Sequence, residues 1–468
     1  MGREIFKNMK KTALINVVGL SKKLVGERMP FLSSWAKSKT VSTIDPVLPA
    51  VTCSVQTTYL TGKWPSEHGI VGNGWYFKEE QEVKLWRQSN KLVKAPSIWD
   101  NAKKINPSFT CANMFWWYNM YSTVDYSVTP RPQYRADGLK VPDCYSSPAG
   151  LRDNLQDRLG RFPLFNFWGP KASIKSSEWI AEASLYVQDN YNPDLLLVYL
   201  PHLDYALQKY GHDGKFLIKD LTEIDNVLKR LVSELERIGL NIFIISEYGI
   251  SNVEHPIHIN RILRENGYLS IRTENGRELM DTGASSVFSL SDHQVAHLYF
   301  KDHSKIPDVE KLLGNHPRID RILDKQAQKD FHLRHDRSGD LVAVAKKGSW
   351  FTYYYWLSDK SAPDFARTVD IHKKPGYDPV EMFLDPGKPF LAPRIMLKLL
   401  AKKMGFRTVM DFIPLNACLV KGSHGRIDLE EEEKAVFLGD YEADQPLNPT
   451  SIHDMLLESI FNEQVSLQ

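Results

Sequence analysis

The chain has 468 residues, of which 59 are basic and 57 acidic, so its formal net charge is only +2. This length favours one large α/β domain with insertions, or two domains. The balance of charge gives no reason to expect a nucleic-acid or polyanionic-surface partner. Four widely spaced cysteines without a Cys-x-x-Cys pair exclude a zinc knuckle and a disulfide framework, which favours a reducing compartment.

The N-terminal residues 1–11 are basic, and the apolar run that follows them, 12–20, has only the length of a strand. This pattern matches neither a signal peptide nor a transmembrane span. We therefore expect a soluble, cytoplasmic protein without a membrane partner.

Three apolar, β-branched runs predict the strands of a parallel sheet. They cover residues 13–18, 195–200 and 241–246, and each is nearly continuous, as expected for strands covered on both faces. Between the last two runs, residues 216–239 have apolar side chains at helical spacing, which predicts a βαβ unit. The sequence thus predicts an α/β protein with a mostly parallel sheet. Helical periodicity also marks residues 179–190, 259–267 and 394–404.

Two stretches differ from a core β/α repeat. Residues 75–170 are dense in aromatic residues and prolines, and we expect an inserted cap segment there, over the active cleft. The aromatic run 115–121 within it is more typical of a core than of a ligand platform. Residues 302–392 are expected to be a second insertion or an extension of the core. The whole chain, 1–468, is assigned to a single catalytic domain.

The segment around Thr52 has the pattern of a nucleophile at the start of a helix. A β-rich approach, 41–51, leads to Thr52, and a run of small residues, 53–60, has helical length. Unpaired backbone N–H groups and the macrodipole at a helix N-terminus favour an anion such as a phosphoryl group. The alternative is that Thr52 is simply an N-cap.

Polar residues follow the ends of the predicted strands. Asp204 and Gln208 come after the strand 195–200, and Glu247 comes directly after the strand 241–246. His424 lies far downstream, in a Gly-Ser-His-Gly stretch. Carboxylates and an imidazole can hold a divalent cation that lowers the pKa of a hydroxyl nucleophile and neutralises phosphate.

These pieces occur in an order that resembles the alkaline phosphatase superfamily, and within it the nucleotide pyrophosphatases/phosphodiesterases. The set comprises the Thr52 segment, a Leu-Thr-Gly, a His-Gly-Ile-Val-Gly-Asn ending in Asn73, Asp204, and a late His424-Gly. The resemblance implies an alkaline-phosphatase-like three-layer α/β/α sandwich. It further implies hydrolysis of a phosphodiester or pyrophosphate bond in a small, nucleotide-like substrate, through a threonyl-phosphate intermediate on Thr52.

The resemblance also implies roles for individual residues. Asn73 would help to hold the phosphoryl oxygen, and Asp204 and His424 would bind the first of two zinc ions. Glu247 would bind a second metal or act as the base for Thr52. The cofactor expected from the resemblance is a divalent metal, namely zinc, with manganese as the alternative.

The chain departs from the family pattern at the metal ligands. Val18 stands where the family has a metal-binding Asp, Gln208 where it has a His, and Glu247-Tyr248 where it has Asp-His. Neutral Gln and Tyr are poor zinc ligands compared with His and carboxylates. A standard di-zinc centre is therefore not expected.

Three hypotheses about function follow from these departures. The first is a hydrolase with relocated metal ligands, such as Asp370 and His372, because Asp-x-His on a strand puts both side chains on one face. The second is a catalytically impaired protein that binds a phosphorylated ligand in the same cleft. The third is a sulfatase, but Cys53 lacks the Cys-x-Pro-x-Arg setting that such an enzyme needs.

Other histidines have no role that the sequence assigns. A relocated ligand set could also include His202 or the pair Asp292-His293. The roles of His255, His258 and His297 stay open, although a structural role for His293 or His297 is expected.

Overall fold

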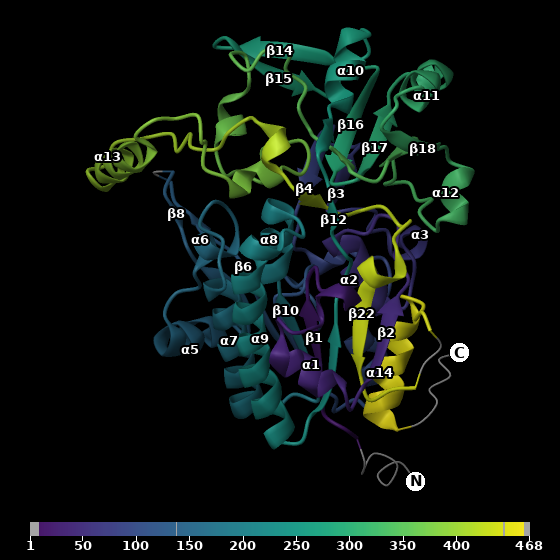
Figure 1. The fold of residues 1–468 in the computed structure, drawn as a ribbon, viewed down its shortest axis with the longest axis vertical. Helices are drawn as coiled ribbons and strands as arrows, with labels where there is room; N and C mark the ends of the chain where they lie inside the picture. Colours follow the sequence, from purple (N-terminus) through teal and green to yellow (C-terminus); the bar gives the residue numbers. More distant parts are fainter. Residues whose placement is uncertain (1–8, 137, 443–444, 463–468) are drawn as a thin grey trace.

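A computed structural model describes residues 9–136, 138–442 and 445–462, and an eight-stranded sheet forms the centre of its larger lobe (Figure 1). β22 and β9 are antiparallel to their neighbours, while the other strands share one direction. In spatial order the strands are β2 (Thr40–Ile44), β22 (Ala435–Gly439), β11 (Asn241–Ile245), β1 (Thr12–Val17), β10 (Leu195–Leu200), β5 (Cys111–Met114), β6 (Tyr126–Pro130) and β9 (Cys144–Ser147).

The three predicted strands lie together in the middle of this sheet. β1 pairs in parallel with β10 on one side and with β11 on the other. Every residue of β1 and β10 is buried, which explains their continuous apolar sequence, because helices cover both faces. The carboxyl ends of these strands point to the same edge of the sheet, where polar residues of the site follow.

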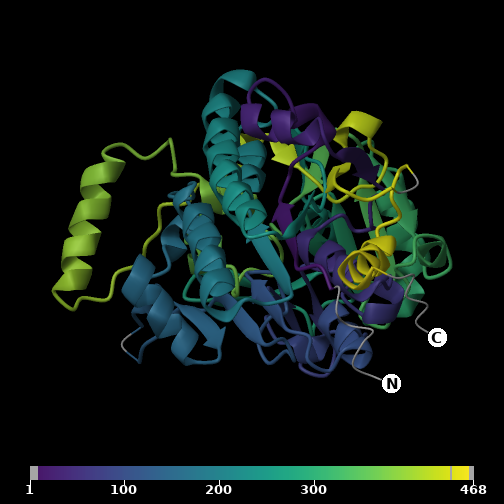
Figure 2. The same ribbon diagram turned by 90° about the horizontal axis from the view of Figure 1, so that it is seen from below.

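Helices form one layer on each face of the sheet, so the lobe has three layers (Figure 2). On one face are α1 (Pro30–Ala36), α5 (Gly150–Leu159), α7 (Lys175–Tyr191) and α9 (Gly214–Arg237), and on the other are α2 (Thr52–Thr61), α4 (Ile98–Ile105) and α14 (Ser451–Phe461). α9 matches the helix expected at 216–239 and buries its apolar stripe. The helix α8 (His202–Tyr210) packs on α9, and α6 (Leu164–Phe167) packs on α7. The expected mostly parallel, three-layer α/β fold is confirmed.

The smaller lobe is built on a second, four-stranded antiparallel sheet with its own hydrophobic core (Figure 1). Aromatic residues such as Trp350, Tyr353 and Trp356 fill this core. Its strands are, in spatial order, β16 (Val287–Asp292), β17 (Val295–Phe300), β19 (Leu341–Ala345) and β18 (Ile319–Leu323). The helices α10 (Ile259–Glu265), α11 (Ile306–Gly314) and α12 (Ala327–Asp330) belong to the same stretch of chain.

Short two-stranded ladders complete the structure. Two of them, β12 (Ser251–Asn252) with β21 (Gly422–Ser423) and β13 (His255–Ile257) with β20 (Ser349–Phe351), tie together distant parts of the sequence. The others are β3 (Gly74–Phe77) with β4 (Glu82–Leu85), β7 (Gln133–Tyr134) with β8 (Lys140–Val141), and β14 (Ser270–Glu274) with β15 (Arg277–Asp281). The remaining helices are α3 (Pro65–His68) and α13 (Leu391–Lys403). No helix in the described part of the chain is long and apolar enough to cross a membrane.

Residues 75–170 differ from the inserted cap that we expected. This stretch contributes β5, β6 and β9 to the central sheet. Phe115 and Trp116, from its aromatic run, are buried in the main core. The many aromatic residues of this stretch therefore pack in the core beside the edge strands. Only part of the stretch lies over the polar residues at the carboxyl ends of the central strands. Residues 302–392 supply β18 and β19 of the second sheet, so they extend the core of the smaller lobe.

Candidate active site

Thr52 is the first residue of α2, as its sequence setting predicts. Val51 precedes it in an extended conformation, and the helix continues to Thr61. The Thr52 side chain is buried, and its Oγ1 lies 3.0 Å from the phenol oxygen of Tyr248. The hydroxyl thus sits at the positive end of a helix dipole, in contact with a residue that follows β11.

Tyr248 connects Thr52 to Asp204. Its phenol O–H donates to Asp204 Oδ1 at 3.3 Å, so its oxygen is left to accept the Thr52 O–H. One helical turn after Asp204 on α8, the amide of Gln208 donates to Asp204 Oδ2 at 2.8 Å. Burial raises the pKa of Asp204 to about 7, although the hydrogen bonds from Gln208 and Tyr248 oppose this rise. Asp204 is therefore suited to accept a proton near neutral pH.

His424 lies beside Asp204, as the order of motifs implied. Its Nδ1–H donates to the backbone oxygen of Ala50 at 2.7 Å, which leaves Nε2 unprotonated. Nε2 is buried, lacks a hydrogen-bond partner, and lies 3.7 Å from Asp204 Oδ1. Burial holds the pKa of His424 well below its usual value, so the ring is neutral.

Glu247 also interacts with Thr52. Its Oε1 accepts hydrogen bonds from Asn16 at 2.6 Å and from Gln56 at 2.5 Å, while its Oε2 is buried without a partner. Burial raises the pKa of Glu247 to about 8, and bonds from Gln56, Asn16 and Thr52 oppose the rise. The carboxyl group is therefore mostly protonated at pH 7.

Asn73 reaches the start of α2, but its amide is already engaged. Its Oδ1 accepts from the backbone N–H of Cys53 at 3.0 Å, and its Nδ2 donates to Asp292 Oδ1 at 3.0 Å. The backbone N–H of Asn73 donates to Asp292 Oδ2 at 2.8 Å. Asp292 therefore fixes Asn73 against the helix N-terminus, and the predicted phosphoryl-binding role of Asn73 stays a prediction.

His293, which the sequence left open, belongs to the site. It occupies the tight turn between β16 and β17 with a positive φ of 63°, a strained conformation for a residue other than glycine. Its ring lies between the rings of Tyr377 and His424, with centroids 3.7 and 3.8 Å away. Its Nδ1 is 2.8 Å from Asp292 Oδ1, and its buried Nε2 lacks a hydrogen-bond partner.

Aromatic residues cover this site. Tyr377 donates its O–H to Gln208 Oε1 at 2.8 Å, and Trp86 and Trp168 pack against its ring. Trp117 packs on Trp86, and its backbone N–H donates to Gln56 Oε1 at 2.7 Å. Three of these residues come from the stretch 75–170, so that part of it does lie over the site.

Asp370 and His372 are not brought into this constellation. They lie in a turn rather than on a strand, so the alternation that would put them on one face is absent. The backbone N–H of Asp370 bonds to Glu381, and its carboxylate pairs with Lys373. The strand expected for this pair is therefore absent, because Asp-x-His defines one face only in an extended chain, and its metal-binding role stays a prediction without support from this geometry.

The other histidines that the sequence left open lie outside this constellation. His202 begins α8, which turns it away from Asp204 and toward Asp220 on α9. His297 donates from Nε2 to the backbone oxygen of Val71 at 3.0 Å, which confirms the structural role expected for one of the pair. His258 bonds to Thr352, and His255 is exposed on β13.

The arrangement fits the two expected metal positions unequally. At the first position, the unpartnered Nε2 of His424 and Asp204 Oδ1 are close enough to bind one ion together. At the second, Val18 is a buried apolar residue, so Glu247 would have to act without the ligands of a standard zinc site. Within the described ranges, these site residues form no group of three His, Cys, Asp or Glu whose ligand atoms lie within 4.8 Å of one another. A two-zinc centre of the usual composition does not fit this site.

Sequence reasoning missed several residues that contact the catalytic candidates. From the sequence, Tyr248 represents only a lost metal ligand, yet in the structure it joins Thr52 to Asp204. Asn16 and Gln56 both bind Glu247, and only Gln56 carried a signal, because it lies one helical turn after Thr52. Tyr377 carried none, since a segment far along the chain brings it to Gln208.

Comparison with known proteins agrees with these observations. Residues 12–378 match the family model for type I phosphodiesterase/nucleotide pyrophosphatase. An uncharacterized pyrophosphatase/phosphodiesterase of Schizosaccharomyces pombe is 27% identical over 225 residues, which are 47% of this chain and 39% of that protein. Ectonucleotide pyrophosphatase/phosphodiesterase 1 of Saccharomyces cerevisiae is 24% identical over 276 residues, or 53% of this chain and 35% of the relative. The chain thus spans well under half of the length of these two relatives.

Solved structures share the fold over almost the whole chain. Murine ectonucleotide pyrophosphatase/phosphodiesterase 5 superposes with a TM-score of 0.59 at 14% identity, covering 98% of this chain and 97% of the other. Phosphonoacetate hydrolase of Sinorhizobium meliloti superposes with a TM-score of 0.61 at 15% identity, covering 97% and 96%. The family match over most of the chain, supported by this common fold, shows that the chain belongs to the type I phosphodiesterase/nucleotide pyrophosphatase family, a family of hydrolases within the alkaline phosphatase superfamily.

Proposed function

We propose that this protein hydrolyses a phosphodiester or pyrophosphate bond of a small, nucleotide-like molecule, with Thr52 as the nucleophile. The observation that carries the proposal is the hydrogen-bonded series from Thr52 through Tyr248 to Asp204 at the N-terminus of α2. Family membership supports the reaction class. The substrate class is supported by murine ectonucleotide pyrophosphatase/phosphodiesterase 5, whose inactive variant has been solved in complex with AMP.

The chemical step would transfer the phosphoryl group to Thr52. A bond forms between Thr52 Oγ1 and phosphorus as the bond to the leaving group breaks. The Thr52 proton passes to the oxygen of Tyr248, and the Tyr248 proton passes to Asp204. A pKa of about 7 makes Asp204 a suitable acceptor at neutral pH. Water then attacks phosphorus and the bond to Thr52 Oγ1 breaks, while the proton held by Asp204 returns through Tyr248 to Thr52, so both residues are regenerated.

The start of α2 would hold the transferred group. Backbone N–H groups in the first turn of a helix lack intrahelical partners and attract anions. Asn73 uses one of its two amide hydrogens on Asp292, so the other can donate to a phosphoryl oxygen. Since Thr52 is only 4% exposed, the aromatic cover around Tyr377 has to move before a substrate can reach it.

One divalent ion, zinc or manganese, would be held by Asp204 and His424. When bound, such an ion neutralises phosphate charge and lowers the pKa of a nearby hydroxyl. Gln208 is a weak candidate as a third ligand, because its oxygen accepts from Tyr377 and its amide N–H faces Asp204. Glu247 is assigned no second ion, and its mostly protonated carboxyl group, held by Asn16 and Gln56, would keep Thr52 in a polar, uncharged setting.

The test is turnover of bis-p-nitrophenyl phosphate by the full chain, with bound metal measured by elemental analysis before and after chelation. Thr52→Ala should abolish turnover while the circular dichroism spectrum and melting temperature stay unchanged. Thr57→Ala is a matched control on the same helix, because Thr57 only donates to the backbone oxygen of Cys53. A Thr52→Ala protein that remains active would refute the proposal.

A second candidate function, binding without turnover, is favoured by one observation. Tyr248 stands where the family pattern has a metal-binding His, and its phenol oxygen links Thr52 to Asp204 by hydrogen bonds. Calorimetric titration with AMP separates the two functions. Binding of AMP without turnover, even with added zinc or manganese, would establish the binding protein.

We also propose that the protein acts in the cytoplasm. All four cysteines are free, and Cys53, Cys111 and Cys144 are buried, as expected in a reducing compartment. Cell fractionation with an antibody to the native chain tests this. Recovery in an extracellular or periplasmic fraction would contradict it.

A further inference from the structure

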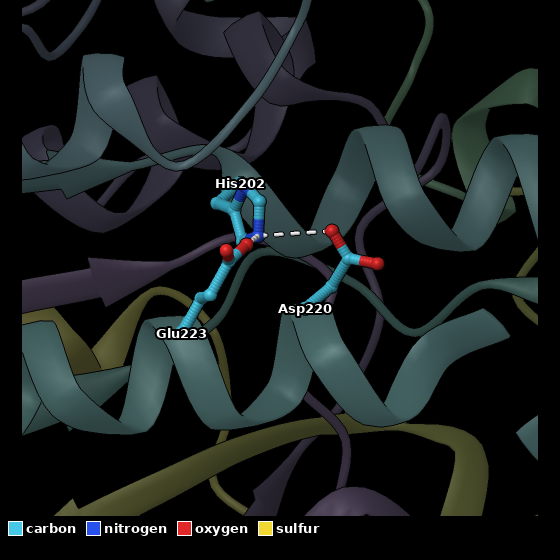
Figure 3. Close-up of side chains that lie close together, drawn as sticks. All are labelled: His202, Asp220 and Glu223. Atoms are coloured by element: carbon cyan, nitrogen blue, oxygen red, sulfur yellow. Dashed lines mark ion pairs between the residues drawn. The ribbon is translucent and has the colours of Figure 1, made fainter. Parts of the chain in front are cut away.

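A cluster of three metal-ligating side chains lies outside the site described above, between α8 and α9. It comprises His202, the first residue of α8, and Asp220 and Glu223 on α9 (Figure 3). Asp220 and Glu223 are three residues apart, so both project from the same face of their helix. Figure 3 shows both carboxylates turned toward the imidazole of His202. Their ligand atoms all lie within 4.8 Å of one another, and no other described group of three does so.

The distances suit a shared ion. His202 Nε2 lies 3.1 Å from Asp220 Oδ1 and 3.6 Å from Glu223 Oε2. Ligand atoms about 2.0–2.1 Å from a tetrahedral zinc ion are about 3.4 Å apart. One imidazole and two carboxylates form a ligand set of the type that Zn²⁺ and Mn²⁺ accept.

A second observation concerns the state of His202. The side chain is only 3% exposed, and neither ring nitrogen has a hydrogen-bond partner. His202 Nε2 is close to Asp220 Oδ1, but the two groups are not oriented so that they form a hydrogen bond. A buried ring nitrogen left without a hydrogen bond beside two carboxylates costs free energy, unless the three groups point at a common ligand.

There is room for that ligand to complete its coordination. A cavity of about 50 Å³ is lined by residues that include His202, Tyr205 and Asp220. This volume holds more than the one water molecule that a three-ligand zinc site needs in its fourth position. Asp220 and Glu223 are 18% and 29% exposed, so an ion can reach the cluster from solvent.

We propose that His202, Asp220 and Glu223 form a binding site for a divalent transition-metal ion, with Zn²⁺ as the best match. It shares no residue with the Asp204–His424 pair, so it does not depend on the proposed function. The competing arrangement is a charged His202 that neutralises the two carboxylates together with Lys219, which lies 3.6 Å from Glu223.

The experiment is calorimetric titration of the full chain with Zn²⁺, combined with the visible absorption spectrum of the Co²⁺-loaded protein. The double variant Asp220→Asn/Glu223→Gln should bind one ion fewer per chain and lose one component of the Co²⁺ spectrum. Glu234→Gln, at an exposed position further along α9, is the matched control and should retain all ions. The variant Asp204→Asn/His424→Gln should still bind an ion at the cluster.

Two outcomes would overturn the proposal. In the first, the Asp220→Asn/Glu223→Gln protein binds as many ions as the parent. In the second, the parent binds no ion that survives the Asp204→Asn/His424→Gln change. Either result would leave the charged-histidine arrangement as the explanation of the cluster.

A different observation carries a second inference. Residues 386–410 form an arm that includes α13 and stands apart from both lobes in two perpendicular views (Figures 1 and 2). No side chain of α13 is buried. Large apolar residues are exposed along the arm, including Phe390 at 82% and Met396 at 70%. An exposed apolar surface of this kind in a folded protein marks an interaction site.

The arm is also strongly basic. It has six basic residues and no acidic residue, although the whole chain has a net charge of only +2. Arg394, Lys398 and Lys402 follow one another at four-residue spacing, which puts them on one ridge of α13. Leu397, Leu400 and Met404 recur at spacings of three and four, and are exposed on another side. Only Lys398 among the basic residues of α13 has an ion-pair partner, Asp411, in the described part of the chain.

We infer that the arm docks on an anionic lipid surface. Unpaired positive charge complements anionic headgroups, and the exposed Leu, Met and Phe side chains would enter the boundary with the acyl chains. This inference departs from our expectation, based on the sequence, that the protein has no membrane partner. That expectation used the net charge of the whole chain, which does not reveal that positive charge is concentrated on the arm. It concerns surface binding, since no described helix is able to span a membrane.

The test is co-sedimentation of the full chain with phosphatidylcholine vesicles that contain phosphatidylserine. Lys402→Glu/Lys403→Glu should weaken binding by roughly 30-fold or more, and Leu397→Glu/Leu400→Glu should abolish it. Lys91→Glu/Lys229→Glu makes the same charge change at exposed positions elsewhere and should bind like the parent. Equal binding to pure phosphatidylcholine, or none to either vesicle, would overturn the inference. A parent dimer that Leu397→Glu/Leu400→Glu dissociates, with no vesicle binding, would assign the surface to a second copy instead.

Discussion

The ring of Tyr248 lies flat against the ring of His424, with centroids 3.6 Å apart and 7° between their planes. This stacking holds the Tyr248 phenol oxygen between Thr52 and Asp204, where the family pattern places a histidine ligand. It also keeps the unpartnered Nε2 of His424 beside Asp204. Tyr248, which in the sequence represents the loss of a metal-binding histidine, is thus the central residue of the hydrogen-bonded series from Thr52 to Asp204.

Removing the Tyr248 hydroxyl tests the proposed proton path. Tyr248→Phe keeps the stacked ring but breaks the link between Thr52 and Asp204, so we expect kcat for bis-p-nitrophenyl phosphate to fall by at least about 100-fold. Tyr377→Phe, which removes a phenol bonded only to Gln208, is the control and should cost much less. Equal activity of Tyr248→Phe and the parent would show that the proton takes another route.

The pH dependence of turnover distinguishes Asp204 from Glu247. Burial raises the pKa of Asp204 to about 7 and that of Glu247 to about 8. Because Asp204 must be ionised to accept the proton, kcat/KM measured after chelation should rise with pH with a midpoint near 7. A divalent ion bound to Asp204 favours the ionised carboxylate, so it should move this midpoint to lower pH. Glu247→Gln should keep that midpoint. If the rise instead disappears in Glu247→Gln, Glu247 is the base.

Restoring the family ligands should restore metal binding. The combined changes Val18→Asp, Gln208→His, Glu247→Asp and Tyr248→His rebuild the ligand types that Zn²⁺ prefers. Elemental analysis should then find more zinc per chain than in the parent, with the cluster at His202 removed in both proteins. A parent that already holds two ions in the catalytic site would disprove our account of the lost ligands.

His297 should make stability depend on pH. Burial lowers the pKa of His297 from 6.5 to about 4, so the folded state keeps the ring neutral while the unfolded state takes up a proton below pH 6.5. The stabilisation present above pH 6.5 is therefore lost as the pH falls, by about 3 kcal/mol near pH 4. Urea unfolding at pH 7 and pH 4 should show a smaller loss in His297→Gln. An unchanged loss would mean that His297 also titrates normally when folded.

Lys374 should be essential for the stability of the segment that carries Tyr377. It is buried, and its Nζ lies 2.7 Å from both Asp378 Oδ2 and Glu381 Oε1. Lys374→Met leaves two buried carboxylates without a cation, so the free energy of unfolding should fall by about 3–5 kcal/mol. Adding Asp378→Asn and Glu381→Gln to this variant should recover most of the loss. Urea midpoints of the single and triple variants check this, and no recovery in the triple variant would contradict the electrostatic cause.

Much of the larger lobe could be predicted from the sequence alone. β1, β10, β11 and α9 are defined by local apolar patterns, which depend only on how far apart buried side chains recur along a strand or a helix. The position of Thr52 at a helix start followed from the same kind of local signal. The stretch 75–170 was misjudged because aromatic and proline content does not tell a cover from an edge of the sheet.

The sequence by itself determined the fold class and the family, and it predicted Thr52, Asp204 and His424 as candidate site residues, because all of these inferences depend on local pattern and on the order of motifs. Only the tertiary structure decided which side chains share a site. It placed His293 and Tyr377 against His424 and Gln208, put Asp370 and His372 in a turn rather than on a strand, and joined His202 to α9. These contacts link residues that are tens to hundreds of positions apart in the sequence. Which of them meet depends on how the helix and sheet layers pack together. A single sequence carries no local signal for that packing.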